Sequence, residues 1–152
     1  MQVVIDDLTG SDIAGLLQAH LDHMSSLSPP ESTHALNLDS LRAPDVTFWT
    51  VREDGQLLGC GALKEIEPQH GEIKSMHTAK AARGRGVAKA IVETILSEAR
   101  RREYERLSLE TGSLAEFEAA RRLYSGFGFE YCAPFAGYVE DPYSVFMTRR
   151  IS

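Results

Sequence analysis

The sequence contains only two cysteines, no long apolar run and no excess of positive charge. Cys60 and Cys132 are too few for a disulfide framework or a zinc pattern, and because each lies in an apolar stretch we expect two buried thiols. No segment approaches the roughly 18 apolar residues that a membrane-spanning helix needs, so we expect no membrane partner. The net charge of −6 argues against a nucleic-acid partner, because such binding requires a basic surface.

The N-terminal residues lack the basic stretch followed by an apolar one that marks a secretion signal, and we expect a cytoplasmic protein. With 152 residues, 43% of them hydrophobic, the chain is long enough to bury a core without disulfides. It contains no repeat, low-complexity tract or linker. Residues 1–152 are therefore expected to form one domain.

Strand and helix signals alternate along the chain. Runs of β-branched and aromatic residues between turn signals predict strands at residues 3–5, 46–52, 57–63, 72–78, 107–109, 130–132 and 144–147. Apolar residues at helical spacing predict helices at residues 13–24, 34–41, 87–99 and 117–127. This order predicts antiparallel strands early in the chain and a β-loop-α-β-α segment in the middle.

A glycine-rich loop, residues 83–88 with the sequence Arg-Gly-Arg-Gly-Val-Ala, lies between a predicted strand and a predicted amphipathic helix. Its two glycines let the backbone approach a ligand, and the N–H groups of the following helical turn are unpaired at the positive end of the helix dipole. Arg83, Arg85 and Lys89 can add charge-assisted contacts. The pattern predicts a phosphate-binding loop, with a glycine turn among solvated arginines as the alternative.

Two other phosphate-binding motifs do not fit this loop. A dinucleotide-binding fingerprint needs a third glycine or an alanine where Lys89 stands. A Walker loop needs a glycine-lysine pair followed by serine or threonine, which is absent. A nucleotide-binding module of either kind is therefore disfavoured.

Two sequence blocks follow one another with a single predicted strand between them: Arg83-x-x-Gly86-x-Ala88 and Ala120-x-x-x-Tyr124-x-x-x-Gly128-Phe129. Both resemble recurring motifs of the GCN5-related N-acetyltransferase (GNAT) superfamily, the first of which reads glutamine/arginine-x-x-glycine-x-glycine/alanine. The resemblance covers residues 46–130. It implies an α/β (α+β) fold with a mixed, mostly antiparallel sheet of about six to seven strands flanked by about four helices.

The resemblance implies an N-acetyltransferase that uses acetyl-CoA as its cosubstrate and no metal. In the superfamily the strand before the loop splays from its neighbour and pairs its backbone with the pantetheine arm of the cosubstrate. That role falls on Met76, His77 and Thr78. The pyrophosphate lies on backbone N–H groups that correspond to Arg83, Gly84, Arg85, Gly86, Val87, Ala88 and Lys89.

Tyr124 stands at the position of the superfamily tyrosine that commonly protonates the departing thiolate. A thiol has a pKa of about 8.5 and a phenol one of about 10, so a tyrosine hydroxyl is a feasible proton donor at neutral pH. The alternative is a core aromatic residue, because Leu123 and Phe127 on the same helix are expected to pack.

The acceptor amine must lose a proton before it attacks the thioester. Glu72 opens the strand that leads into the loop, and some superfamily members place a glutamate there. It is our first candidate for the base or for the group that positions a water. On a regular strand Glu72 shares a face with Met76. A solvated glutamate paired with Lys74 is the alternative interpretation, and Glu65 and His34 are further candidates for the base.

Two polar segments are candidates for contacts with the acceptor. Residues 28–36 contain Glu31 and His34, and residues 138–144 contain Tyr143; each segment could instead be an ordinary turn. We expect a small-molecule or amino-acid-like amine as the acceptor. Because members of the superfamily are often dimeric, a homodimer is a further expectation.

One position departs from the superfamily pattern. Many members carry an asparagine that binds the pantetheine where this chain has Phe117, which can only stack or pack. The alternative function is a non-catalytic acyl-CoA sensor or interaction domain on the same fold. Such a domain would need the loop but neither Tyr124 nor a base.

Overall fold

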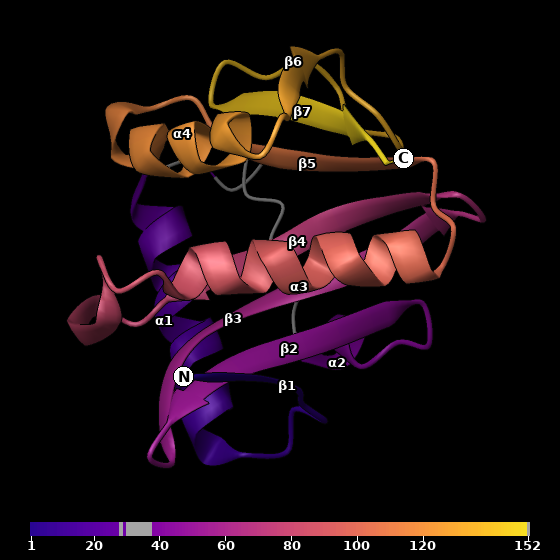
Figure 1. Ribbon diagram of the computed structural model, residues 1–152. Helices are drawn as coiled ribbons and strands as arrows, with labels where there is room; N and C mark the ends of the chain where they lie inside the picture. Colours follow the sequence, from indigo (N-terminus) through magenta and orange to yellow (C-terminus); the bar gives the residue numbers. More distant parts are fainter. Residues whose placement is uncertain (28, 30–37, 152) are drawn as a thin grey trace.

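The computed structural model describes residues 1–27, 29 and 38–151, and within these ranges the strands form one seven-stranded sheet (Figure 1). The strands are β1 Gln2–Ile5, β2 Val46–Glu53, β3 Gln56–Glu67, β4 His70–Thr78, β5 Arg106–Gly112, β6 Glu130–Cys132 and β7 Ser144–Arg150. Their order in the sheet is β1-β2-β3-β4-β5-β7-β6. All neighbours are antiparallel except β4 and β5, which are parallel. The predicted mixed, mostly antiparallel sheet is confirmed.

Helices cover both faces of the sheet (Figure 1). The helices are α1 Ser11–Leu27, α2 Leu38–Leu41, α3 Val87–Arg101 and α4 Glu118–Gly126, with short 3-10 turns η2 Lys80–Ala82 and η3 Ala115–Phe117. The helix predicted at residues 34–41 is described only from Leu38 onward, and residues 34–37 lie outside the described ranges. No helix in the described part of the chain is long and apolar enough to span a membrane.

The alternation of side chains along the strands divides the core into two clusters, one on each face. On β2, Trp49 and Val51 pack with α3, whereas Phe48 packs with the cluster that includes residues of α1 and α2. The predicted apolar stripe of α3 is buried along its whole length, and its members are Val87, Ile91, Val92, Ile95, Leu96 and Ala99. Burial of this stripe fixes the start of α3, and with it the glycine-rich loop, against the sheet.

The two cysteines differ from one another in the structure. Cys60 on β3 is fully buried, as expected, and burial raises the pKa of its thiol to about 12. Cys132 lies on the edge strand β6 and is half-buried, because a three-residue edge strand is covered on fewer sides. The expectation of two buried thiols is therefore wrong for Cys132.

The parallel strands β4 and β5 diverge partway along their length. They pair only from His70 with Arg106 to Ile73 with Leu109. Beyond these pairs β4 continues to Thr78 and β5 to Gly112. Within the described residues no strand pairs with this edge of β4 after Ile73, and a gap opens between the two strands.

A bulge interrupts β4 just where it leaves β5. Ser75 has a φ of 55°, and the register with β3 shifts at this point. Ile73 and Met76 both belong to the cluster under α3, although regular alternation would put residues three apart on opposite faces. The expectation that Glu72 and Met76 share a face is therefore wrong, because the extra residue at the bulge reverses the alternation.

Candidate active site

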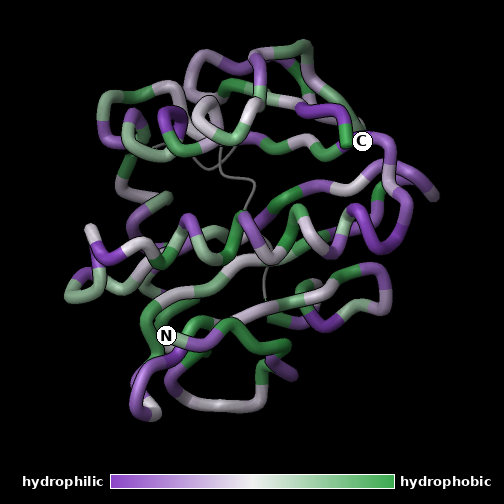
Figure 2. The backbone as a smooth tube through the Cα atoms, viewed as in Figure 1, coloured by the Kyte–Doolittle hydropathy of each residue, from purple (hydrophilic) through white to green (hydrophobic). Residues whose placement is uncertain are grey.

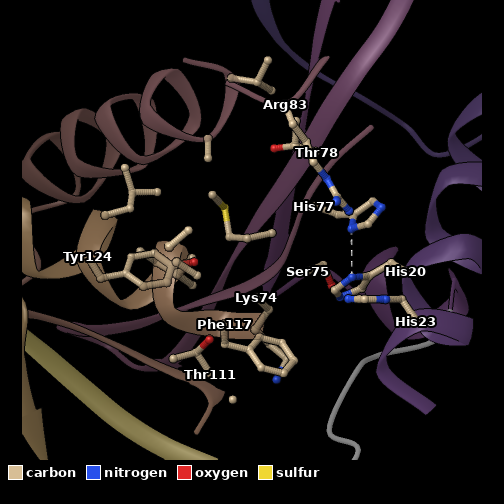
Figure 3. Close-up of a pocket in the computed structure, with 18 of the residues that line it drawn as sticks. His20, His23, Lys74, Ser75, His77, Thr78, Arg83, Thr111, Phe117 and Tyr124 are labelled. Atoms are coloured by element: carbon tan, nitrogen blue, oxygen red, sulfur yellow. Dashed lines mark hydrogen bonds between the residues drawn. The ribbon is translucent and has the colours of Figure 1, made fainter. Parts of the chain in front are cut away.

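A cleft of about 690 Å³ lies where β4 and β5 diverge. Its walls come from α1, from β4, from the glycine-rich loop with the start of α3, from the end of β5 with η3, and from α4 (Figure 3). These segments include both sequence blocks and the strand that precedes the loop. The cleft therefore gathers most of the site residues predicted from the sequence.

The backbone of the glycine-rich loop is left-handed at both of its glycines. Gly84 and Gly86 have φ values of 79° and 82°, in the region that L-residues with side chains rarely adopt. Gly86 is the N-cap of α3, so the unpaired N–H groups of the first turn follow it directly. The loop residues that line the cleft are Arg83, Gly84, Gly86, Val87, Ala88 and Lys89.

Arg85 alone among the predicted loop residues is not part of the cleft lining. Its guanidinium forms an ion pair with the carboxylate of Glu53 at the end of β2, and this contact is the main cause that lowers the pKa of Glu53. The side chain of Arg85 therefore links the glycine-rich loop to the end of β2. Arg83 and Lys89 remain as the loop cations beside the cleft.

Residues Met76, His77 and Thr78 line the cleft on the edge of β4 that β5 has left. On the opposite edge His77 and Thr78 pair with Cys60 and Gly59 of β3, so the backbone is held in an extended form there. An extended edge without a strand partner can accept an added strand-like ligand. This is the arrangement that the sequence predicted for the pantetheine arm.

Tyr124 is both a packed aromatic residue of the core and a residue of the cleft lining. Its side chain is 5% exposed, packs in the cluster under α3 and α4, and meets the ring of Phe129 edge-on at a centroid distance of 5.9 Å. It also lines the cleft (Figure 3). Burial raises the pKa of the hydroxyl, so the phenol stays protonated at neutral pH.

Glu72 is buried rather than solvated, with 3% of its surface exposed. Its Oε2 accepts hydrogen bonds from Lys74 Nζ at 3.1 Å and from the hydroxyl of Tyr138 at 2.7 Å. Lys74 Nζ also donates to the Tyr138 hydroxyl at 2.8 Å. The predicted pairing with Lys74 is present, but it is part of a closed network of three side chains, of which Glu72 and Lys74 line the cleft.

Tyr138 is a member of this network that the sequence analysis missed. The residue predicted in the segment 138–144 is Tyr143, and neither tyrosine is part of the cleft lining. Tyr143 instead forms a turn before β7: its N–H donates to Asp141 Oδ1 at 2.8 Å and its carbonyl accepts from Ser113. Burial, followed by the nearby charge of Glu72, raises the pKa of Tyr138.

Three further candidates for proton or acceptor contacts were predicted from the sequence. Glu65 accepts a hydrogen bond from the Tyr104 hydroxyl at 2.8 Å and is not part of the cleft lining. Glu31 and His34 fall outside the described residues.

Two histidines from different elements meet at the opposite side of the cleft from Tyr124 (Figure 3). Nδ1 of His20 on α1 and Nδ1 of His77 on β4 are 3.2 Å apart, within hydrogen-bond distance. Burial lowers the pKa of His20 to about 4 and also lowers that of His77. His23, one turn further along α1, also lines the cleft. In the sequence, His20 is one residue of the helix predicted at residues 13–24, with no signal for a contact with His77.

Charge is unevenly distributed along the cleft. The end at the start of α3 carries Arg83 and Lys89, whereas the opposite walls carry Glu110 and Glu116. The first end suits an anionic group such as a phosphate. In the part of the chain that the structure describes, no group of three or more His, Cys, Asp or Glu side chains is arranged to hold a metal ion.

The chain is similar to known proteins in both sequence and structure. The model of the acetyltransferase (GNAT) family matches residues 14–129. The chain is 56% identical over 151 residues to the uncharacterized N-acetyltransferase YsnE of Bacillus subtilis (strain 168), covering 99% of this chain and 100% of that protein. It is 50% identical over 143 residues to the uncharacterized N-acetyltransferase YedL of Escherichia coli (strain K12), covering 94% and 90%. A crystal structure described as an acyl-CoA N-acyltransferase from Klebsiella pneumoniae superposes with a TM-score of 0.79 at 27% identity, covering 99% and 97%.

Proposed function

This chain belongs to the acetyltransferase (GNAT) family and is an acyltransferase, and on that basis we propose that it transfers an acetyl group from acetyl-CoA to the primary amine of a small molecule or amino-acid-like acceptor. One observation carries the proposal. A single cleft brings together the glycine-rich loop, the open edge of β4 and the Tyr124 side chain.

The donor is proposed to lie along the basic side of the cleft. The backbone N–H groups from Arg83 to Lys89 surround the start of α3, where the helix dipole and the two cations favour a pyrophosphate. The open edge at Met76 to Thr78 offers backbone partners to the amide groups of a pantetheine arm. Neither of these proposed contacts uses the side chain of Phe117.

Acetyl transfer by direct attack requires two proton movements. The amine nitrogen forms a bond to the thioester carbon, the carbon–sulfur bond breaks, and the departing thiolate takes a proton. We assign that proton to the Tyr124 hydroxyl, which faces the cleft and stays protonated over the neutral pH range. The acceptor amine must lose its own proton on the other side of the thioester.

Glu72 is proposed to hold the acceptor ammonium or an ordered water beside it. Its Oε2 is fixed by hydrogen bonds from the Tyr138 hydroxyl and from Lys74 Nζ. A carboxylate held in this way offers its remaining acceptor sites to a cation or a water. Of the two roles considered for Glu72, positioning is the one that its contacts favour.

The alternative is an acyl-CoA sensor that binds the donor without turnover. Calorimetric titration with acetyl-CoA, and separately with NAD and ATP, tests the donor site first. Selective micromolar binding of acetyl-CoA is expected. Gly86→Glu should abolish that binding because it adds a carboxylate and a side chain at a positive φ. Ser97→Glu, on the exposed part of α3 away from the cleft, is the control of equal charge.

Thiol release with a panel of primary amines then separates the enzyme from the sensor. Turnover above the rate of spontaneous hydrolysis, with formation of the N-acetyl product by mass spectrometry, supports the enzyme. Tight donor binding with no product for any amine would favour the sensor. Failure to bind acetyl-CoA would contradict both.

The expected homodimer is a separate proposal. Its test is the molar mass in solution by light scattering, with and without acetyl-CoA.

A further inference from the structure

The hydrogen bond between His20 and His77 joins two imidazoles that both face the cleft. Their ring centroids are 4.8 Å apart, and the rings come from α1 and β4, which approach each other only through tertiary packing. Figure 3 shows the pair on the opposite side of the cleft from Tyr124. The pair therefore lies on the side of the cleft from which the acceptor amine has to lose its proton.

A hydrogen bond between two neutral imidazoles has a definite chemical consequence. One Nδ1 carries the shared proton and donates, and the other Nδ1 accepts. The outer nitrogens are then unlike: Nε2 of the donating ring is an acceptor, and Nε2 of the accepting ring carries a proton. A proton that enters at the first Nε2 can pass through the shared bond and be replaced by one that leaves from the second.

The surroundings of the pair oppose a lasting positive charge. Burial lowers the pKa of both rings. The rings of His77 and then His23 lower that of His20 further, and the Arg83 guanidinium and then the ring of His23 lower that of His77 further. The Cys60 thiol, paired with His77 across the sheet, is buried and neutral. A single imidazole here would hold a proton poorly, whereas a pair that releases one proton as it accepts another avoids the imidazolium.

Glu72 does not provide an equally open route. Its Oε2 already accepts from Lys74 and Tyr138, so a proton placed there would lie beside an ammonium. No such cation donates to the shared bond of the histidines. The two histidines can therefore take up one proton and release another, which the Glu72 network does not offer.

We propose that the His20–His77 pair is the path by which the proton of the acceptor amine leaves the cleft during acetyl transfer. The inference rests on the proposed acetyltransferase function. In the step, the acceptor R–NH₃⁺ gives one proton to the Nε2 acceptor of the pair, and the proton on the other Nε2 leaves to water. The nitrogen lone pair then attacks the thioester carbon, the carbon–sulfur bond breaks, and the departing thiolate takes the proton of the Tyr124 hydroxyl. The second proton of the amine nitrogen leaves to water as the amide forms, and Tyr124 takes a proton back from water. The histidines end as the opposite tautomers and return by exchange with water, so no net charge is stored.

The test replaces His77 by asparagine, whose amide can keep a hydrogen bond near the position of Nδ1 but has no second ring nitrogen. His20→Asn is the second variant, in case either one folds poorly. His70→Asn is the matched control, because His70 is also a half-buried histidine, bonded to Ser108 at 2.7 Å, but it is not part of the cleft lining. Folding of each variant is checked by thermal unfolding and by acetyl-CoA affinity.

Acetyl transfer is measured with two acceptors, an alkylamine that is mostly ammonium at pH 7 and methoxyamine, which is already neutral there. For the alkylamine, kcat/KM should fall roughly 100-fold in both pair variants, in line with the usual contribution of a positioned acid–base group. For methoxyamine it should stay near the wild-type value. Equal losses with both acceptors would overturn the proposal in favour of a packing role, and no loss with the alkylamine would overturn it outright. All assays contain EDTA, and loss of wild-type activity in EDTA would also contradict the proton path.

Nitrogen-15 NMR of the imidazoles gives a readout that does not depend on turnover. At pH 7 both rings should be neutral and should show opposite or exchanging tautomers. A protonated ring, or two rings fixed in the same tautomer, would contradict the proton path while leaving the acetyltransferase function untouched. Absence of thiol release from the wild type with every amine, combined with the expected NMR signals, would instead contradict the proposed function.

Discussion

The hydroxyl of Tyr138 donates a hydrogen bond to Oε2 of Glu72 across 2.7 Å, although the two residues are 66 positions apart in the chain. The contact ties the segment between β6 and β7 to the middle of the sheet. Tyr138 also packs against Phe135 and Phe146, with ring centroids 5.3 and 5.5 Å away. The carboxylate of Glu72 is thus held by a residue whose own ring is fixed by aromatic neighbours.

Replacing Tyr138 by phenylalanine should loosen Glu72 while keeping the aromatic packing. The loss of one hydrogen bond to a buried carboxylate should lower the free energy of unfolding by about 1–3 kcal/mol. The KM for the acceptor amine should rise, and the affinity for acetyl-CoA should not change. Tyr131→Phe, at a tyrosine that is 62% exposed, should change neither quantity. An acceptor KM equal to the wild-type value would remove Tyr138 from the positioning of Glu72.

Replacing Tyr124 by phenylalanine should lower kcat roughly 100-fold, the usual size of a lost general acid. Calorimetric affinity for acetyl-CoA should be preserved, because the ring still fills its place against Phe129. Tyr104→Phe is the control, since Tyr104 is buried and bonded to Glu65 away from the cleft. It should cost stability without loss of turnover. Unchanged kcat in Tyr124→Phe would show that Tyr124 is a packing residue only.

Arg83 and Arg85 provide a matched pair within one loop. Arg83→Ala should weaken acetyl-CoA binding roughly ten- to a hundredfold, in keeping with the loss of one charged hydrogen bond. Its effect should shrink at high salt. Arg85→Ala should leave the affinity nearly unchanged, because that guanidinium pairs with Glu53 and does not line the cleft. Equal weakening by the two variants would mean that Arg85 turns toward the donor when it binds.

Gly112 is the place where the end of β5 depends on the absence of a side chain. A Cβ at this position would lie 2.1 Å from Cδ2 of Phe117. Gly112→Ala should therefore displace the Phe117 ring and lower the free energy of unfolding by about 1–3 kcal/mol. Gly126→Ala on α4 is the control, because nothing lies within 4 Å of the added atom. Chemical denaturation compares the two, and an equal effect would contradict the steric explanation.

The low pKa of His20 predicts a dependence of stability on pH. Folding lowers this pKa to about 4 from the ordinary 6.5, so between those values the unfolded chain binds more protons than the folded one. Stability should fall as the pH drops from about 6.5 toward 4, by roughly 3 kcal/mol from His20 alone. Urea unfolding of the wild type and of His20→Gln should give a flatter pH profile for the variant. Parallel profiles would contradict the assigned pKa.

The fold and the loop could be predicted because their signals are local. The hydropathy pattern that identifies the buried face of α3 follows helical periodicity, and the positive φ angles of Gly84 and Gly86 follow from the glycines themselves (Figure 2). The Glu72–Lys74 pairing is also local and was anticipated. By contrast, the His20–His77 contact joins residues 57 positions apart, and the hydrogen bond from Tyr138 to Glu72 joins residues 66 positions apart. No periodicity or motif within one element specifies such pairs.

The bulge at Ser75 had no local signal either. A serine with a φ of 55° is not a residue that a sequence pattern marks for a left-handed backbone. It is maintained by the register of β3 on one side and by the divergence of β5 on the other. Because the bulge was not predicted, Met76 was wrongly assigned to the same face of the strand as Glu72.

The same bulge makes the facing of the side chains in β4 depend on the number of residues in the strand. Removal of the residue at position 75 would move every following side chain of β4 to the opposite face of the sheet. His77 would turn away from His20 and Met76 would turn toward α1, with the composition of the strand almost unaltered. The spacing between Glu72 and His77, more than the identity of Ser75, is what the chemistry of the cleft depends on.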